Sequence, residues 1–315
     1  MTDKTALSPI VETYRTNVNR RMKMYKPMRF WGTSAGAPIP APFCKCSVCE
    51  NARIVGGKEV RLRSAFRIDK KIMIDIGQDF AAQAIRLGDD LSEVEHLLFT
   101  HTHSDHFNYS MFWLRLIASA EPPKHAVKVY LTDDAYSYID KVLYSTPLLI
   151  DKNGEYLKEK NVEFVKLEFN HTYKINDIEV TPLRGAHHTA LERNSANYLI
   201  KLSDGRLMYY ALDSGYYLDD TFEYLKNFKL DILVGECTFP SIGGEGDGCP
   251  VHMDLTSCTA TLDKLYENGT IDEQTDIYLS HIEAKGMNHA QLEEYFTNID
   301  RKYNVKIAYD GLSII

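Results

Sequence analysis

The run at residues 101–106, His-Thr-His-Ser-Asp-His, concentrates side chains that bind metal ions. It places three imidazoles and one carboxylate within six residues, directly after an apolar, strand-like stretch at 94–100. Neutral imidazole nitrogen and carboxylate oxygen are the ligands that zinc and similar divalent ions take. Because residues two apart in an extended segment point the same way, His101 and His103 can bind one ion. Asp105 and His106, where the chain turns into a helix, can bind a second ion close by. The run therefore predicts a metal site, and a His-rich surface turn is the alternative.

A second group of metal-binding type consists of cysteines. Cys44, Cys46 and Cys49 lie within six residues of one another. A disulfide between Cys44 and Cys46 would be strained. Three thiolates in a short loop suit a structural zinc ion, provided that a fourth ligand arrives from elsewhere. The alternative is a loop of free thiols.

Composition indicates a globular protein without an obvious polyanionic partner. The chain has 315 residues, of which 44% are hydrophobic and 25% charged, with a formal net charge of -8. This charge disfavours general binding to nucleic acid or to anionic membranes, which needs a basic surface. No apolar run is long enough to span a bilayer. The first residues show no apolar segment followed by a cleavage site, so we expect a cytoplasmic protein.

Strand-like and helical stretches alternate along the chain. Residues 1–27 are polar and are interpreted as an N-terminal extension, and residues 28–315 as one domain. Asp204-Gly205 predicts a hairpin turn between two strands. Two sheets covered by helices fit the pattern, which is an α/β class (α+β in some schemes). Helices are expected near 78–87, 107–120, 133–144, 218–227, 255–267 and 289–302.

Further ligand-type residues follow apolar strands elsewhere in the chain. Asp75 comes after residues 71–74, and Asp213 after residues 207–212. His281 follows residues 277–280, and the pair His187-His188 follows residues 178–183. One such residue at a strand end is usually a turn former or a surface group. Four of them, together with the histidine run, favour a shared metal site.

This combined pattern resembles the metallo-β-lactamase superfamily over about residues 28–315. The resemblance implies an αββα sandwich that carries two metal ions at its edge. It implies that the first ion is bound by His101, His103 and His187, and the second by Asp105, His106 and His281, with Asp213 bridging both. Asp75 and Glu236 are expected to support the ligands, Asp75 by orienting a ligand histidine. His188 competes with His187 for the third imidazole position.

The cysteine cluster narrows the resemblance. Residues 31–49 are similar to the subfamily of the phosphodiesterase of the carbon–phosphorus lyase pathway (PhnP), and a relative in pyrroloquinoline quinone biosynthesis shares the cysteine arrangement. That subfamily commonly takes its fourth zinc ligand three residues after the His281 equivalent, where this chain has Ala284. His289 or water is the expected substitute.

The resemblance implies a hydrolase with two divalent ions, zinc or manganese or iron, and one structural zinc. A hydroxide shared by the ions would attack a small, cyclic or nucleotide-like phosphodiester. Asp105 and His252 are the predicted catalytic residues, with His252 as general acid or, alternatively, a loop histidine that caps the helix beginning near Leu255. Hydrolysis of thioesters or other esters, and a non-catalytic accessory role, remain open. The expected partner is a small-molecule substrate, with no membrane or general nucleic-acid binding, and a homodimer is one option for the assembly.

Overall fold

The structure, a computed structural model, describes residues 28–144, 161–241 and 249–314. The expected extension at residues 1–27 lies outside the described residues. Within the described ranges, no helix combines the length and the apolar character needed to cross a membrane.

Two seven-stranded sheets form the centre of the fold. In order across the first sheet, the strands are β14 (Ser313–Ile314), β1 (Met28–Gly32), β2 (Ala65–Arg67), β3 (Ile72–Ile74), β4 (His96–Leu98), β5 (Val127–Thr132) and β6 (Val162–Leu167). Across the second sheet they are β13 (Val305–Ile307), β12 (Asp276–Ser280), β11 (Ile232–Glu236), β10 (Leu207–Ala211), β9 (Ala196–Lys201), β8 (Ile178–Arg184) and β7 (Tyr173–Ile175).

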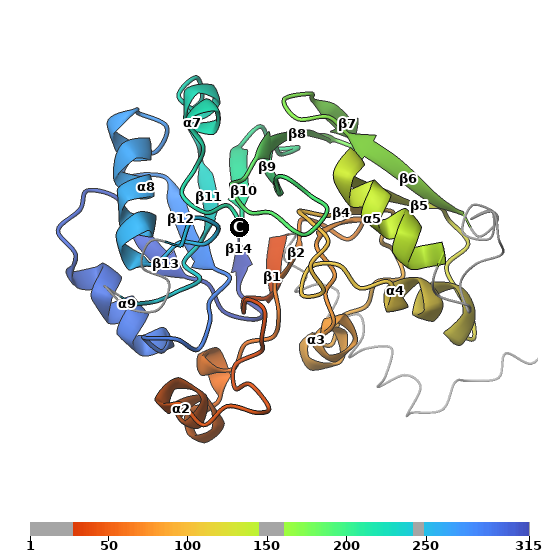
Figure 1. Cartoon of the computed structure of the whole chain (residues 1–315), viewed down its shortest axis with the longest axis horizontal. Coiled ribbons are helices and arrows are strands. Elements are labelled where there is room, and N and C mark those ends of the chain that lie inside the picture. Colours follow the sequence, from red (N-terminus) through yellow and green to blue (C-terminus); the bar gives the residue numbers. More distant parts are fainter. Residues whose placement is uncertain (1–27, 145–160, 242–248, 315) are drawn as a thin grey trace, which may run out of the picture.

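Helices cover the outer face of each sheet (Figure 1). On the side of the first sheet lie α3 (Phe80–Leu87), α4 (Ser110–Trp113) and α5 (Asp133–Tyr144), and on the side of the second lie α7 (Asp219–Leu225), α8 (Leu255–Glu267) and α9 (His289–Asn298). A further helix, α2 (Ser47–Val55), carries Cys49 and contributes the buried Val48 and Ala52 to the apolar cluster on the outer face of the second sheet (Figure 1). The expected αββα sandwich is confirmed.

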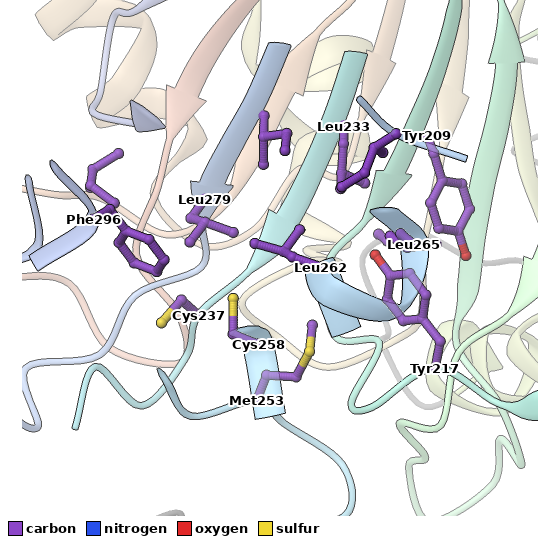
Figure 2. Close-up of a cluster of buried hydrophobic side chains, with 14 of the residues drawn as sticks. Tyr209, Tyr217, Leu233, Cys237, Met253, Cys258, Leu262, Leu265, Leu279 and Phe296 are labelled. Atoms are coloured by element: carbon purple, nitrogen blue, oxygen red, sulfur yellow. The ribbon is translucent and has the colours of Figure 1, made fainter. Parts of the chain in front are cut away.

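The period of two along each strand explains why the layers stack in this way. In β10, Met208 and Tyr210 point into the cluster between the sheets, whereas Tyr209 and Ala211 point into the cluster under the outer helices. Strands buried on both faces are expected to be apolar throughout. Figure 2 shows the outer cluster, in which Tyr209, Leu233 and Leu279 lie near Leu262 and Leu265 of α8.

The expected elements are present, with shifted ends. The hairpin at Asp204-Gly205 is confirmed: β9 and β10 pair antiparallel, and Gly205 has a φ of 91°. The helix expected at 107–120 is shorter and begins as α4 at Ser110. The amide N–H of Asn108 instead donates to the carbonyl of Ile76, 2.9 Å away, which ties the segment after the histidine run to the end of β3. A π-helical turn, Leu114–Ala118, follows α4.

Candidate metal centre

The predicted ligands meet because parallel strands end at the same edge. β3 and β4 are parallel neighbours in the first sheet, and β10, β11 and β12 are parallel neighbours in the second. Molecules and ions that bind to open α/β sheets typically lie just outside the carboxyl ends of such strands. The loops after β4, β8, β10 and β12 supply the His101–His106 run, His187, Asp213 and His281, respectively.

The first group of candidate ligands consists of His101, His103 and His187, whose ligand-type atoms all lie within 4.8 Å of one another. The Nδ1 atom of His103 lies 3.0 Å from the Nε2 atom of His101 and 3.0 Å from that of His187. His101 and His187 are buried, and burial lowers the pKa of both imidazoles, which keeps them in the neutral form that binds metal. His103 is exposed, so the centre opens to solvent on its side.

The second group consists of Asp105, His106 and His281. The Nε2 atoms of His106 and His281 lie 3.1 Å apart, and Asp105 Oδ2 lies 3.4 Å and 3.8 Å from them. Asp213 lies between the two groups: its Oδ2 atom is 2.6 Å from His106 Nε2 and 3.9 Å from His101 Nε2. Burial alone would raise the pKa of Asp213, but the imidazoles around it, His281 first, hold that pKa well below its usual value.

Hydrogen bonds behind the ligands decide which ring nitrogens carry protons. Asp75 Oδ2 accepts from His106 Nδ1 at 2.7 Å, and the carbonyl of Val251 accepts from His187 Nδ1 at 3.1 Å. Thr238 donates its hydroxyl to Glu236 at 2.5 Å, so its oxygen accepts from His281 Nδ1 at 2.8 Å. In each ring the Nδ1 proton leaves a lone pair on Nε2, which points into the centre.

This arrangement fits bound cations. The inner lone pairs of His106 and His281 face each other and the carboxylate of Asp213, so acceptors meet acceptors. Asp213 Oδ2 is buried and accepts no hydrogen bond. Buried charged groups are normally paired or coordinate a metal. The donor set, five imidazoles and two carboxylates, is the kind that divalent zinc, manganese or iron ions accept.

Three of the strand-end residues adopt left-handed backbone conformations. Asp75, Asp213 and His281 have φ values of 59°, 49° and 57°. Such conformations are uncommon for residues other than glycine, and they concentrate at functional sites. At Asp75, the main-chain N–H and hydroxyl of Thr100 donate to the carboxylate at 2.8 Å and 2.9 Å, which keeps it facing His106.

His252 stands beside the centre. Its Nδ1 atom lies 3.2 Å from Asp213 Oδ1 and 3.3 Å from Glu236 Oε2. Burial lowers its pKa, but the hydrogen bond that His252 donates to Glu236 outweighs this, and the net shift is upward. Glu236 also accepts the amide N–H groups of Ser214 and Gly215, each at 2.7 Å, so it fixes both His252 and the turn that presents Asp213.

The three cysteines also come together, but His289 does not join them. The sulfur atoms of Cys44, Cys46 and Cys49 lie within 4.8 Å of one another. His289 is buried elsewhere: its Nδ1 atom lies 2.7 Å from Arg61 Nη2, and its Nε2 atom 3.0 Å from Glu293 Oε1. The geometry therefore does not support His289 as the fourth ligand. Ala284 does lie beside the cluster, where its carbonyl accepts from Cys46 Sγ at 3.4 Å.

Two further residues complete the comparison with the sequence predictions. His188 is exposed, because adjacent residues of an extended segment point to opposite sides and His187 points inward. Glu192, which the sequence analysis did not single out, is buried beneath the histidine run and accepts the N–H of Thr102 at 3.0 Å. A single Glu in a polar loop gives no signal that would have identified it.

Solved structures with this fold include several metal-dependent proteins. A diphosphatase from the PhnP family is 20% identical, with 90% of this chain and 94% of that chain covered and a TM-score of 0.65. Zn(2+)-bound PqqB from Methylobacterium extorquens is 15% identical (90% and 98% covered, TM-score 0.63). The short form of human tRNase Z is also 15% identical (90% and 97% covered, TM-score 0.58). A search of curated protein sequences gave no match.

At the level of sequence families, a model described as the beta-lactamase superfamily domain matches residues 70–282. The matched region contains the residues of both groups, from His101 to His281, together with Asp75. It makes up more than half of the chain, and the chain therefore belongs to the β-lactamase superfamily.

Proposed function

We propose that this protein is a dinuclear metal-dependent hydrolase that cleaves a small phosphodiester, with residues 28–315 as its catalytic domain. The observation that carries the proposal is the pair of three-ligand groups that meet at Asp213. A single structural ion would need only one of them.

The two groups would hold two divalent ions, which activate a water molecule and neutralise charge on the substrate oxygens. Asp105 and Asp213 bring negative charge that balances the ions. His103 and His252 lie on the more exposed side of the centre, which is where a substrate enters. From there His252, held through Nδ1 by Glu236, is placed to give a proton to a leaving alkoxide.

Two adjacent cation sites and a proton donor, His252, favour a phosphodiester over other esters as the substrate. A phosphodiester carries a negative charge that the two ions bind, and its alkoxide leaving group needs a proton. The fold similarity to a PhnP-family diphosphatase is consistent with this choice. The similarity to tRNase Z is limited to the fold, and the net charge of -8 argues against an RNA substrate.

The cysteine cluster is proposed to hold a structural zinc ion through Cys44, Cys46 and Cys49. Three soft sulfur donors that lie close together suit zinc. Water is then the proposed fourth ligand.

The test is hydrolysis by protein loaded with zinc, manganese or iron, on bis(p-nitrophenyl) phosphate, small cyclic phosphates and a thioester panel. We expect turnover of the phosphodiesters and none after Asp213→Ala, with circular dichroism showing that the variant is folded. His188→Gln is the matched control, since His188 is an exposed histidine next to a ligand, and it should retain activity. Tight binding of two ions without turnover of any substrate would instead support an accessory role.

The role of His252 has its own test, based on the leaving group. His252→Gln should slow the cleavage of alkyl phosphodiesters by about 10²–10⁴-fold, the usual contribution of a general acid. It should slow the release of p-nitrophenol much less, because that leaving group needs no proton. An equal loss on both substrates would show that His252 acts as a ligand or in packing.

A further inference from the structure

Glu192 is a buried carboxylate that the proposed reaction does not use. It lies in the loop between β8 and β9 and is 2% exposed. Its Oε2 atom accepts three hydrogen bonds: the main-chain N–H of Thr102 at 3.0 Å, the hydroxyl of Thr102, and the hydroxyl of Thr189 at 3.0 Å. Its Oε1 atom is buried without a hydrogen-bond partner.

These contacts join the two segments that supply every ligand of the first group. Thr102 lies between His101 and His103, and Thr189 lies two residues after His187. Thr102 and Glu192 are 90 residues apart in the sequence. The side chain of Glu192 thus connects the histidine run on the first sheet to the loop of His187 on the second.

Main-chain hydrogen bonds extend this connection. Within the loop, the N–H of Thr189 donates to the carbonyl of Glu192 at 3.0 Å, and the N–H of Ser195 donates to the carbonyl of His187 at 2.8 Å. Between the segments, the N–H of Ala196 donates to the carbonyl of Thr100 at 2.7 Å. The loop is therefore folded on itself and attached to the histidine run through the carboxylate of Glu192, and the start of β9 is attached to Thr100, the residue before the run.

The negative charge of Glu192 also links this residue to the His101–His103–His187 group. In the described parts of the chain, no lysine or arginine forms an ion pair with it. A buried carboxylate without a cationic partner is costly. The positive charges that could offset this cost are those of ions bound by the histidines on either side of Thr102.

We infer that Glu192 is a positioning residue that sets the affinity of the His101–His103–His187 group for its metal ion, with little effect on the second group. This inference rests on the proposed metal centre. Residues that hold metal ligands in place typically change metal affinity by about 10–100-fold when they are replaced. The second group is held instead by Asp75 and Thr238, which Glu192 does not contact.

The experiment titrates the metal-free full-length protein with Co²⁺ and follows its visible absorption. Cobalt bound by thiolates gives a separate near-ultraviolet charge-transfer band, so the cysteine cluster is recognised independently. His103→Ala assigns the absorption of the first group, and His281→Ala that of the second. We expect Glu192→Ala to weaken the first group by about 10–100-fold and the second by less than about threefold.

Glu192→Gln separates geometry from charge. The amide oxygen can still accept from Thr102, so a variant that recovers most of the affinity shows that the hydrogen bonds dominate. A loss like that of Glu192→Ala shows that the negative charge dominates. Either result supports positioning. If Glu192→Ala does not fold, Thr102→Val and Thr102→Ser replace it, and only Thr102→Val should weaken the first group.

Glu59 provides the matched control. It is also a buried glutamate that accepts main-chain N–H groups, those of His289 at 2.9 Å and Ala290 at 3.3 Å, but it is not in contact with any ligand. Glu59→Gln should lower the melting temperature and leave both cobalt affinities unchanged.

The inference is overturned if Glu192→Ala leaves both affinities unchanged, or weakens both groups equally as a general loss of stability would. Its failure can be told apart from failure of the proposed function. If the wild-type protein binds two ions but hydrolyses nothing, the function fails while the role of Glu192 is still measured. If the histidines bind no ion at all, both fail.

Discussion

The His/Asp centre and the cysteine cluster are both compact groups of metal ligands, but only the first is supported from behind. At the centre, Asp75 holds His106, the carbonyl of Val251 holds His187, and Thr238 holds His281. Asp75 and Thr238 are buried in the segments that directly follow β3 and β11, and Val251 lies in a turn. The ligands are therefore fixed before an ion arrives.

The cysteine sulfur atoms are held by weaker hydrogen bonds than the imidazoles of the centre. The hydrogen bonds between these sulfur atoms and the rest of the described chain involve main-chain groups, such as the N–H of Ala41, 3.4 Å from Cys49 Sγ, and the carbonyl of Ala284. Burial raises the pKa of Cys49 to about 11, whereas the main-chain N–H of Cys46 lowers the pKa of Cys44. Metal binding has to remove the proton from Cys49. The difference teaches that two groups of potential metal ligands of similar size can differ in how firmly the surrounding side chains hold them.

The strongest test of this contrast is Asp213→Asn, which keeps the shape of the side chain and removes the charge shared by both groups. We expect loss of hydrolysis and weaker binding of both ions, because the inner lone pairs of His106 and His281 then face an amide. The Cys49→Ser variant should retain hydrolysis. Metal analysis and initial rates on the same samples check both. Equal loss of activity in the two variants would remove the distinction.

Asp75→Asn tests the support behind one ligand. Asn tolerates the positive φ of this position, so the backbone should persist. The side-chain amide can place an N–H donor against His106 Nδ1. This favours the His106 tautomer with its proton on Nε2, and that nitrogen then has no lone pair for the metal ion. We expect metal affinity to fall by about 10–100-fold. Isothermal titration of the metal-free protein measures it, with Asp79→Asn as control. An unchanged affinity would mean that His106 needs no such partner.

Cys49→Ser should act on stability rather than on chemistry. If the cluster binds zinc, the variant loses one zinc equivalent and unfolds at a lower temperature, while kcat changes little. Thermal unfolding with and without a chelator checks this. Cys258→Ser, at a buried cysteine of the cluster in Figure 2, is the control that should leave the zinc content unchanged. If neither variant loses zinc, the three cysteines are better explained as a loop of free thiols.

Ala284→His should strengthen the cysteine cluster by adding a donor next to Cys46. The carbonyl of Ala284 is 3.4 Å from Cys46 Sγ, so an imidazole at this position is close to the sulfur atoms. Competition with a zinc chelator should show tighter binding. His289→Gln should leave that binding unchanged, since His289 contacts Arg61. The prediction of tighter zinc binding is contradicted if Ala284→His and His289→Gln both compete with the chelator as the wild-type protein does.

His289 gives the smallest expected effect, on the pH dependence of stability. Burial lowers its pKa to about 4, against about 6.5 for an unfolded histidine. The unfolded chain therefore binds more protons between these values, and stability falls as the pH drops from 6.5 towards 4. Urea unfolding at pH 7.5 and 5 should show a smaller difference for His289→Gln than for the wild-type protein. An identical difference would show that His289 does not contribute to it.

The predictions made from sequence succeeded where the signal was local or repeated. The αββα order follows from alternating strands and helices, and the turn at Asp204-Gly205 from two residues. The ligand types could be named because each follows an apolar strand. Helix ends were less accurate, as at Ser110, because the hydrogen bond from Asn108 to Ile76 joins segments that are distant in sequence.

The sequence by itself determined the chemistry: imidazoles and carboxylates at strand ends, and three thiols in one loop. Only the tertiary structure decided which of these residues meet. It turned His187 inward and His188 outward, placed His289 against Arg61 and not against the cysteines, and brought Glu192 under Thr102. The physical reason is that residue types and strand positions are local properties, whereas distances between ligands depend on the pairing and packing of two sheets.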